Sequence, residues 1–271
     1  MSPRPTVRQL LQESGLPPLE ARALLARAGG TAREALIAHP ERVVEPAVAD
    51  AFAELAAQRR SRAPMAYLLG VQEFFGHAFR VTPDVLIPRP ETELLVEFAL
   101  EALTPLPAPK VLELGTGSGC IAASIALARP DAQVTATDVS IAALSLAREN
   151  LQMLGARATL IESDWYLAVE GRYDLIVSNP PYVASGDPHL DELCFEPRGA
   201  LTDEADGLGH LRAIVAGAPA HLLPGGRVLV EHGYDQGAAV RALLQGAGFE
   251  DAKTLRDLAG LERVGVGGGL Q

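Results

Sequence analysis

The stretch that decides the fold is Glu113-Leu114-Gly115-Thr116-Gly117-Ser118-Gly119, which lies between an apolar, strand-like run and a helical pattern that starts at Cys120. Glycines at alternate positions let the backbone turn tightly and approach a ligand with no Cβ in the way. The start of the following helix supplies free N–H groups. The dinucleotide fingerprint would need its third glycine at position 120, where this chain has Cys120. The stretch therefore predicts a loop that binds a nucleoside-bearing cofactor without dinucleotide spacing.

Predicted strands and helices alternate from Lys110 onward. Helices are expected from Cys120, from Ile141 and near Leu208 to Leu223, and strands at Val111 to Leu114, Val134 to Thr137, Thr159 to Ile161, Leu175 to Val177 and Arg227 to Val230. A turn is expected at Pro224-Gly225-Gly226. This alternation predicts an α/β fold with a doubly wound, mostly parallel sheet and helices on both faces. Ligands of such sheets bind at the carboxyl ends of the strands.

Two residues that follow the second and third predicted strands are candidates for cofactor contacts. Asp138 lies 19 residues after Gly119, where an acidic side chain can accept hydrogen bonds from both ribose hydroxyls. The alternative role for Asp138 is to cap the next helix, in competition with Ser140. Trp165 is the only tryptophan and is placed to pack on adenine. Its alternative role is to fill the core.

The strand predicted at Leu175 to Val177 leads into Asn179-Pro180-Pro181-Tyr182. Two consecutive prolines fix φ at about −65° and remove two backbone donors, which makes a stiff elbow lined with acceptors. The side-chain oxygen of Asn179 and the carbonyl oxygen of Pro180 can both accept from one planar NH2 group, with the ring of Tyr182 beside it. A substrate amide or an exocyclic base amine suits this geometry. The alternative is a plain strand-ending turn, because Asn-Pro commonly opens turns.

Composition narrows the classes of function. With 271 residues, 48% of them hydrophobic and 21% charged, the chain has the composition of a soluble globular protein. The net charge of −11 argues against a protein that binds nucleic acid through contacts to the phosphates. Cys120 and Cys194 lack the spacing of zinc ligands, so no metal is expected. No signal-peptide core and no apolar run of about 20 residues is present, so we expect a cytoplasmic protein without a membrane partner.

Three segments are expected along the chain. Residues 1–72 are predicted to form a small helical domain, because apolar residues recur at helical spacing to about Arg62. β-forming residues on either side of Pro83-Asp84 predict a β-hairpin, or an extended linker, over residues 73–88. Residues 89–271 are expected to form the α/β domain. The Arg89 segment at its start either folds over the ligand crevice or is only a structural linker.

The glycine spacing, with an acidic residue two positions before the first glycine, resembles motif I of the class I S-adenosylmethionine (SAM)-dependent methyltransferases. Beyond this motif, the whole chain resembles the peptide chain release factor glutamine methyltransferases, the PrmC/HemK family. The segments that carry the resemblance, in order, are Glu73-Phe74-Phe75-Gly76, Pro88-Arg89-Pro90-Glu91-Thr92-Glu93, the glycine loop, the elbow Asn179-Pro180-Pro181-Tyr182, Phe195-Glu196-Pro197 and Glu231-His232-Gly233.

The resemblance implies N5-methylation of the glutamine in the Gly-Gly-Gln motif of class I release factors, with S-adenosyl-L-homocysteine as the second product. It implies that Gly115, Thr116, Gly117, Ser118, Gly119, Asp138, Trp165 and Asn179 bind the methyl donor. It further implies that Asn179, Pro180, Pro181 and Tyr182 hold the glutamine, with Asn179, Pro180 and Tyr182 as catalytic residues. The helical domain would dock the release factor. No stable nucleic-acid partner is expected, although adenine-N6 and guanine-N2 methyltransferases share the elbow.

Overall fold

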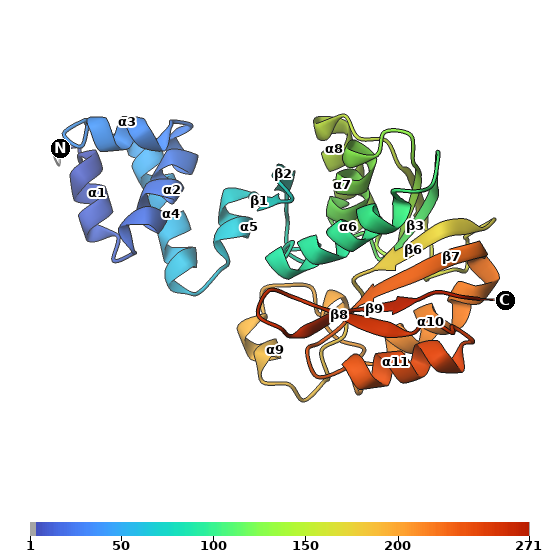
Figure 1. Cartoon of the computed structure of the whole chain (residues 1–271). Helices are drawn as coiled ribbons and strands as arrows, with labels where there is room; N and C mark the ends of the chain where they lie inside the picture. Colours follow the sequence, from blue (N-terminus) through green and yellow to red (C-terminus); the bar gives the residue numbers. More distant parts are fainter. Residues whose placement is uncertain (1–3, 271) are drawn as a thin grey trace. The chain divides into compact units, whose positions relative to one another are not determined.

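A computed structural model describes residues 4–270 and shows two compact units, which divide after Val71 (Figure 1). The first unit is helical, with α1 (Val7–Glu13), α2 (Pro18–Gly29), α3 (Arg33–Ala38), α4 (Pro46–Arg60) and α5 (Met65–Leu69). Thr6 caps α1 in a reciprocal pair with Gln9, and α2 and α4 both begin with a proline. The buried core of this unit includes Leu24, Leu25 and Phe52.

A short hairpin connects this unit to the α/β domain. Its strands are β1 (Val71–Phe74) and β2 (His77–Arg80), and the turn residues Phe75 and Gly76 have φ values of 50° and 74°. Two successive positive φ values are those of a type I′ turn, which matches the twist of paired strands. The prediction that placed the hairpin around Pro83-Asp84 was therefore wrong in position. Residues 81–89 contain no strand and lead to α6 (Pro90–Leu103).

The second unit contains a seven-stranded sheet in the order β5-β4-β3-β6-β7-β9-β8. The strands are β3 (Lys110–Leu114), β4 (Gln133–Asp138), β5 (Thr159–Glu162), β6 (Tyr173–Ser178), β7 (Leu222–Glu231), β8 (Lys253–Arg256) and β9 (Glu262–Gly267). All pairs among the first five strands are parallel, and β9 runs antiparallel to both β7 and β8. The prediction of a mostly parallel sheet is confirmed, while β8 and β9 were not predicted.

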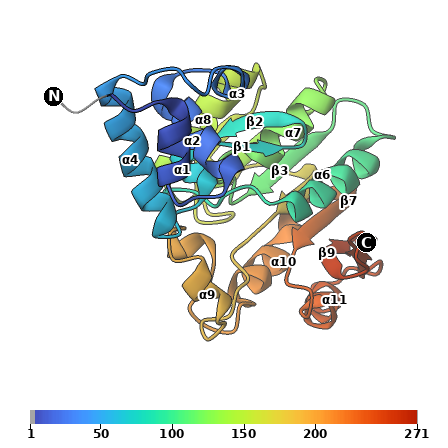
Figure 2. The same ribbon diagram turned by 90° about the vertical axis from the view of Figure 1, so that its left-hand side faces the viewer.

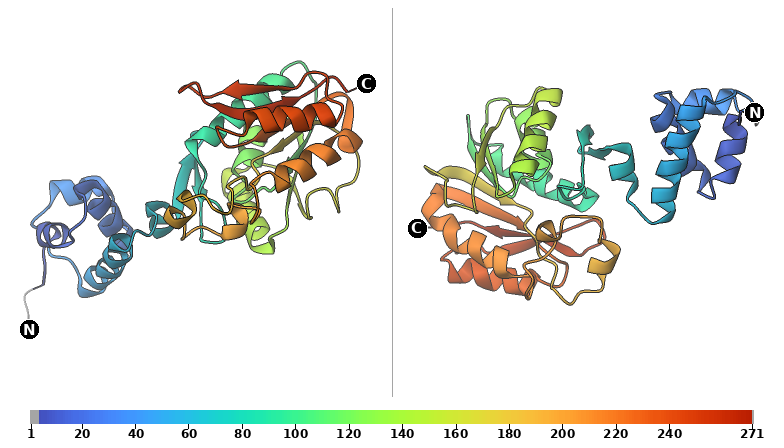
Figure 3. Two further views of the ribbon diagram at one scale, coloured as in Figure 1. Left: turned by 90° about the horizontal axis from the view of Figure 1, so that it is seen from below. Right: turned by 180° about the vertical axis from the view of Figure 1, so that it is seen from behind.

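Helices cover both faces of this sheet (Figure 3). On one face lie α6, α7 (Cys120–Ala128) and α8 (Ile141–Leu154), and on the other α10 (Gly209–His221) and α11 (Gly237–Gly246). Neighbouring residues of β6 alternate between the two cores, so that Leu175 and Val177 face α6 and α7 while Ile176 faces α10. Helix α6 packs along β6 and β7 (Figure 2). Short helical turns at His189–Glu192 (α9) and Arg198–Ala200 follow the elbow.

The boundary between α10 and β7 differs from the prediction. The helix ends at His221, and Pro224-Gly225-Gly226 lies within the bounds of β7 rather than before the strand. Leu222 already pairs with Tyr173, and pairing resumes only at Arg227 with Leu175. The residues between these two pairs form an irregularity inside the strand, because a proline and two glycines do not continue the ladder.

Candidate active site

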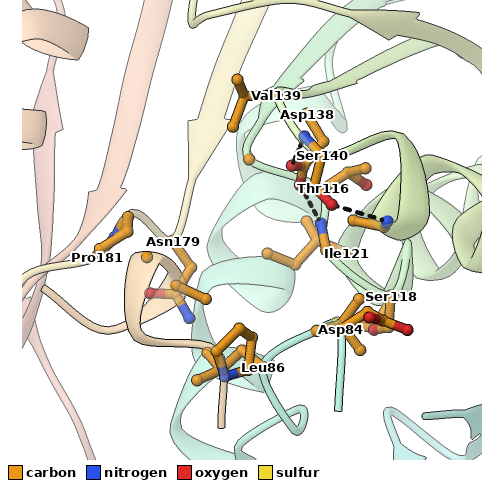
Figure 4. A pocket seen from close by; sticks show the side chains of 18 of the residues that line it. Asp84, Leu86, Thr116, Ser118, Ile121, Asp138, Val139, Ser140, Asn179 and Pro181 are labelled. Carbon is orange, nitrogen blue, oxygen red and sulfur yellow. Dashed lines mark hydrogen bonds between the residues drawn. The ribbon is translucent and has the colours of Figure 1, made fainter. Parts of the chain in front are cut away.

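The order of strands reverses between β3 and β6, and a cavity of about 320 Å³ opens at the carboxyl ends of the strands there. Asn179 and Pro181 border it from the end of β6, while Thr116, Asp138 and Ser140 border it from the opposite side (Figure 4). The structure thus brings the glycine loop and the elbow to one cavity. A volume of this size is typical of small-molecule sites.

The glycine loop takes its shape from its backbone. Gly115, Gly117 and Gly119 have φ values of 74°, 53° and 80°, a region that L side chains rarely adopt. A Cβ on Gly119 would also lie only 3.0 Å from the Cβ of Ala147 in α8. Glycine at 119 therefore serves both the turn and the close packing of two helices.

Glu113 lies on the buried side of this loop, and its place in the motif was the only role predicted for it. Its Oε2 accepts hydrogen bonds from Thr116 Oγ1 at 2.7 Å and from the backbone N–H of Ala122 at 3.0 Å. Its Oε1 is buried and has no hydrogen-bond partner among the described residues. Burial raises the pKa of this carboxyl to about 8, against the opposing effect of the two hydrogen bonds.

Asp138 ends β4 and lines the cavity. Its two carboxylate oxygens accept from the backbone N–H groups of Gly117 at 2.8 Å and Ser140 at 2.9 Å. The side chain of Ser140, rather than that of Asp138, caps α8 by accepting from Ala143 N. Because a carboxylate has about four acceptor positions, Asp138 holds the glycine loop and keeps acceptor capacity toward the cavity.

Trp165 lies where the cavity meets the core. It lies in a loop after β5, lines the cavity, and packs against the core on the α10 side. Its ring is 5.2 Å from that of His210, which also lines the cavity, and near Gly115. Its φ of 47° is unusual for a bulky residue and turns the chain at this point. His210 was not singled out from the sequence.

The elbow is held by side chains from three directions. Asn179 Nδ2 donates to Thr92 Oγ1 at 3.0 Å, and Tyr182 Oη donates to Glu231 Oε1 at 3.1 Å. The carbonyl oxygen of Tyr182 accepts from Gln236 Nε2 at 2.9 Å. Asn179 and Pro181 border the cavity, whereas Pro180 and Tyr182 are not among its lining residues. Burial raises the pKa of Tyr182, and the adjacent Glu231 raises it further.

The Arg89 segment also borders the cavity, through Asp84, Val85, Leu86, Pro88 and Arg89. The guanidinium of Arg89 forms an ion pair with the buried carboxylate of Glu196. The other oxygen of Glu196 accepts from the backbone N–H of Ile87 at 3.0 Å. Glu196 therefore ties this segment to the loop that follows the elbow, so the segment does more than link two domains.

The residues present fit a nucleoside-bearing methyl donor. Space beside Gly117 is open in the glycine loop, Asp138 offers acceptors for ribose hydroxyls, and Trp165 offers a flat apolar surface for a base. Thr116 of the glycine loop and Asp138 lie across the cavity from Asn179 (Figure 4). A donor bound there would face the acceptors of the elbow.

Comparison with known proteins agrees with this arrangement. Residues 91–194 match the family model of the Methyltransferase small domain, and residues 6–70 match that of the PrmC N-terminal domain. The fold resembles a T. thermophilus 16S rRNA methyltransferase solved with AdoMet and guanosine, with a TM-score of 0.54 and 24% identity over 73% of this chain and 49% of that one. It also resembles a Pyrococcus furiosus methyltransferase, with a TM-score of 0.53 and 21% identity over 78% and 96% of the two chains. The α/β domain therefore has the class I SAM-dependent methyltransferase fold.

Whole-chain relatives narrow this class. The chain is 56% identical to a release factor glutamine methyltransferase of Bordetella pertussis, over 96% of this chain and 98% of that one. It is 52% identical to the protein of the same name from Burkholderia pseudomallei, over 97% and 95% of the two chains. It belongs to the release factor glutamine methyltransferase family. No helix within residues 4–270 is both long and apolar enough to cross a membrane.

Proposed function

We propose that this chain transfers the methyl group of S-adenosyl-L-methionine to the side-chain amide nitrogen, N5, of the glutamine in the Gly-Gly-Gln motif of class I peptide chain release factors. The observation that carries the proposal is the position of Asn179, which faces the glycine loop across one cavity. Family membership supports the choice of a protein glutamine as substrate.

On the donor side, Gly115 to Gly119, Asp138 and Trp165 would hold S-adenosyl-L-methionine, with Asn179 at its methyl end. When bound, this cofactor supplies an electrophilic methyl group on a sulfonium and leaves as S-adenosyl-L-homocysteine. The loop presents backbone N–H groups, Asp138 accepts from the ribose, and Trp165 packs on adenine. Each of these contacts fixes the position of the donor without taking part in bond making.

On the acceptor side, the elbow has to activate a poor nucleophile. The lone pair of an amide nitrogen is delocalised into its carbonyl group. Asn179 Oδ1 and the carbonyl oxygen of Pro180 would accept the two N–H hydrogens, which raises electron density at nitrogen and holds it in line with the methyl group. Pro181 and Tyr182 give the elbow its stiffness and flank the amide. The methylated nitrogen is acidic enough to lose its proton without a strong base.

The alternative function, methylation of an exocyclic amine of adenine or guanine, uses the same elbow chemistry. Enzymes of that kind must hold a flipped base and a phosphate backbone, which calls for a basic surface. This chain has a net charge of −11 and only two lysines, Lys110 and Lys253. Its charge and its family therefore both favour a protein substrate.

The helical unit, residues 1–72 in the predicted division, is proposed to dock the release factor. This unit has its own core and exposes large apolar side chains, among them Leu19 and Ile37 at 77% and 60% of their surface. Exposed side chains of this kind are available for contact with a protein partner. The partner would bind there in addition to inserting its glutamine at the elbow.

A single substitution tests this docking. Ile37→Glu should raise the Michaelis constant for whole release factor several-fold, because it places a charge in an apolar contact, and should leave the constant for a short Gly-Gly-Gln peptide unchanged. Met153→Glu, at an exposed position of α8, is the matched control. Equal effects of Ile37→Glu on the two substrates would contradict docking by this unit.

The proposed reaction is tested by offering labelled S-adenosyl-L-methionine with three substrates: whole class I release factor, a release factor in which the Gly-Gly-Gln glutamine is replaced, and ribosomal RNA or DNA. We expect label in the first alone. Label in the nucleic acid and none in the release factor would overturn the proposal.

A further inference from the structure

The two ends of the elbow bond to two buried polar side chains, Thr92 and Glu231. Ser178 of β6 pairs with Val230 of β7, so that Asn179 and Glu231 follow paired residues of adjacent strands. Helix α6 packs against both strands and brings Thr92, in its first turn, to the same place. Glu231 and Thr92 are only 1% and 2% exposed. The Tyr182 hydroxyl donates to Glu231 directly, and Asn179 Nδ2 donates to Thr92.

The orientation of the Asn179 amide decides whether the elbow can work. An asparagine side chain has nearly the same shape with its oxygen and nitrogen exchanged, but only the oxygen accepts a hydrogen from a substrate NH2 group. In the structure, Nδ2 points to Thr92 Oγ1, at 3.0 Å, which leaves Oδ1 for the substrate. Whatever makes Thr92 an acceptor toward Asn179 therefore sets the amide in its productive orientation.

A threonine hydroxyl has one hydrogen and two lone pairs. Thr92 is an obligate acceptor toward Asn179 only if its own hydrogen is directed elsewhere. Glu231 offers the acceptor, because its Oε2 is buried and has no hydrogen-bond partner among the described residues. Burial raises the pKa of Glu231, and the hydroxyls of Thr92 and Tyr182 act against that rise. An ionised carboxylate can only accept hydrogen bonds. An ionised Glu231 would therefore accept the hydroxyl hydrogen of Thr92, and that hydrogen would point away from Asn179.

We propose that Glu231 and Thr92 are positioning residues, which together hold the Asn179 amide with Oδ1 toward the substrate. Glu231 receives the Thr92 hydrogen, Thr92 receives a hydrogen from Asn179, and Asn179 is left to accept from the glutamine. Thr92 lines the cavity and Glu231 does not, and both are proposed to act on the substrate only through Asn179. This inference rests on the proposed function, because it requires an NH2 substrate at the elbow.

The arrangement responds to pH. Burial raises the pKa of Glu231 to about 7, against the hydroxyls of Thr92 and Tyr182 and the charge of Arg263, while the charge of Glu91 raises it. A protonated Glu231 can donate to Thr92, which frees the hydroxyl hydrogen of Thr92 to point at Asn179. The amide can then turn and present its NH2 group to the substrate. The rate of methyl transfer should therefore fall as the pH falls through about 7.

The test compares Thr92→Val, which has the same shape without a hydroxyl, with Thr92→Ser, which keeps the hydroxyl. At saturating donor, Thr92→Val should lower the single-turnover rate of methyl transfer to a Gly-Gly-Gln peptide by roughly 10- to 100-fold, as expected for a misplaced reacting group. Thr92→Ser should keep most of the rate. Thr104→Val, at the exposed end of the same helix, is the control and should match the wild type.

Two further measurements separate positioning from a merely structural role. Donor affinity measured by calorimetry should be unchanged in Thr92→Val, and Glu231→Gln should remove the acid limb of the wild-type pH profile. The inference is overturned if Thr92→Val transfers at the wild-type rate, if Thr92→Val and Thr92→Ser lose the same activity, or if the acid limb persists in Glu231→Gln. A wild-type protein that leaves the glutamine unmethylated would instead refute the proposed function.

Discussion

Glu113 and Glu231 lie on opposite sides of β6, at or near the carboxyl ends of β3 and β7. Their environments differ in the groups that bond to each carboxyl. Both are 1% exposed, both have one oxygen without a partner among the described residues, and burial raises the pKa of both. Glu113 bonds to the Thr116 hydroxyl and a backbone N–H at the donor loop. Glu231 bonds to the side-chain hydroxyl of Tyr182, beneath the elbow.

The difference shows how the two sides of the cavity are built. The proposed donor side is shaped chiefly by its backbone, through three glycines at positive φ and the N–H groups that Asp138 binds. The proposed acceptor side depends on the orientation of one side chain, Asn179, whose amide donates to Thr92. We therefore expect substitutions on the acceptor side to affect the transfer rate and those on the donor side to affect binding or stability.

The largest effect is expected for Asn179→Ala. It removes an acceptor that acts mainly in the transition state, and loss of a comparable group in other enzymes costs about 10²- to 10³-fold in rate. Donor affinity should change little. Single-turnover rates and calorimetric donor affinity, measured on the same preparation, separate the two quantities. A near-normal rate of transfer would show that Asn179 has no role in the mechanism. It would also contradict the proposed difference between the two sides of the cavity.

Glu113→Gln should alter stability in a pH-dependent way. Because the folded-state pKa of Glu113 is raised to about 8, the folded state binds a proton that the unfolded state has lost, and this group makes stability fall as the pH rises from about 4.5 to about 8. Between pH 6 and pH 8 the wild type should lose about 2 kcal/mol of unfolding free energy through Glu113. Denaturant unfolding at both pH values measures this loss.

In Glu113→Gln, this part of the pH dependence should be absent, since an amide does not titrate in this range. Glu231→Gln provides the comparison. The pKa of Glu231 in the folded protein is about 7, lower than that of Glu113, so the loss of unfolding free energy through Glu231 should level off as the pH rises above about 7. An unchanged pH dependence in Glu113→Gln would show that Glu113 is ionised throughout this range in the folded protein.

The smallest of the three effects is expected for Asp138→Ala, which should weaken donor binding by about tenfold, or about 1.4 kcal/mol. The substitution removes the acceptor for Gly117 and Ser140 as well as the proposed ribose contact. The transfer rate at saturating donor should stay close to that of the wild type. Calorimetry measures the affinity, with Asp138→Asn as the variant that keeps one acceptor. An unchanged affinity would contradict the donor role of Asp138.

The sequence predicted those parts of the fold in which local pattern and tertiary role agree. The glycine loop and the buried strands β3, β4 and β6 are of this kind, because apolar runs end in turn residues there. Strand β9 was missed because it contains glycines where side chains would meet the helix behind it. A Cβ on Gly265 would collide with Val240, and one on Gly267 would lie 2.8 Å from Phe249. Glycine weakens the strand signal at the very positions where packing needs it.

The residues of the site fall into two groups, those that local sequence pattern can locate and those that it cannot. Residues that follow strands, such as Asp138 and Asn179, can be found from their place in the pattern. Residues that act on them from elsewhere in the chain cannot, because their roles depend on the pairing of β6 with β7 and on the packing of α6. Thr92 lies 87 positions from Asn179 and Glu231 lies 49 from Tyr182, and only the fold brings them together.

The central claim is that the methyl group reaches the side-chain amide nitrogen of a glutamine. The most direct measurement is acid hydrolysis of release factor labelled by this chain, followed by identification of the labelled product. Transfer to the amide nitrogen predicts labelled methylamine and no labelled methanol, and predicts neither product from a release factor that lacks the Gly-Gly-Gln glutamine. Label released as methanol, or label that persists in the glutamine-lacking protein, would contradict the account.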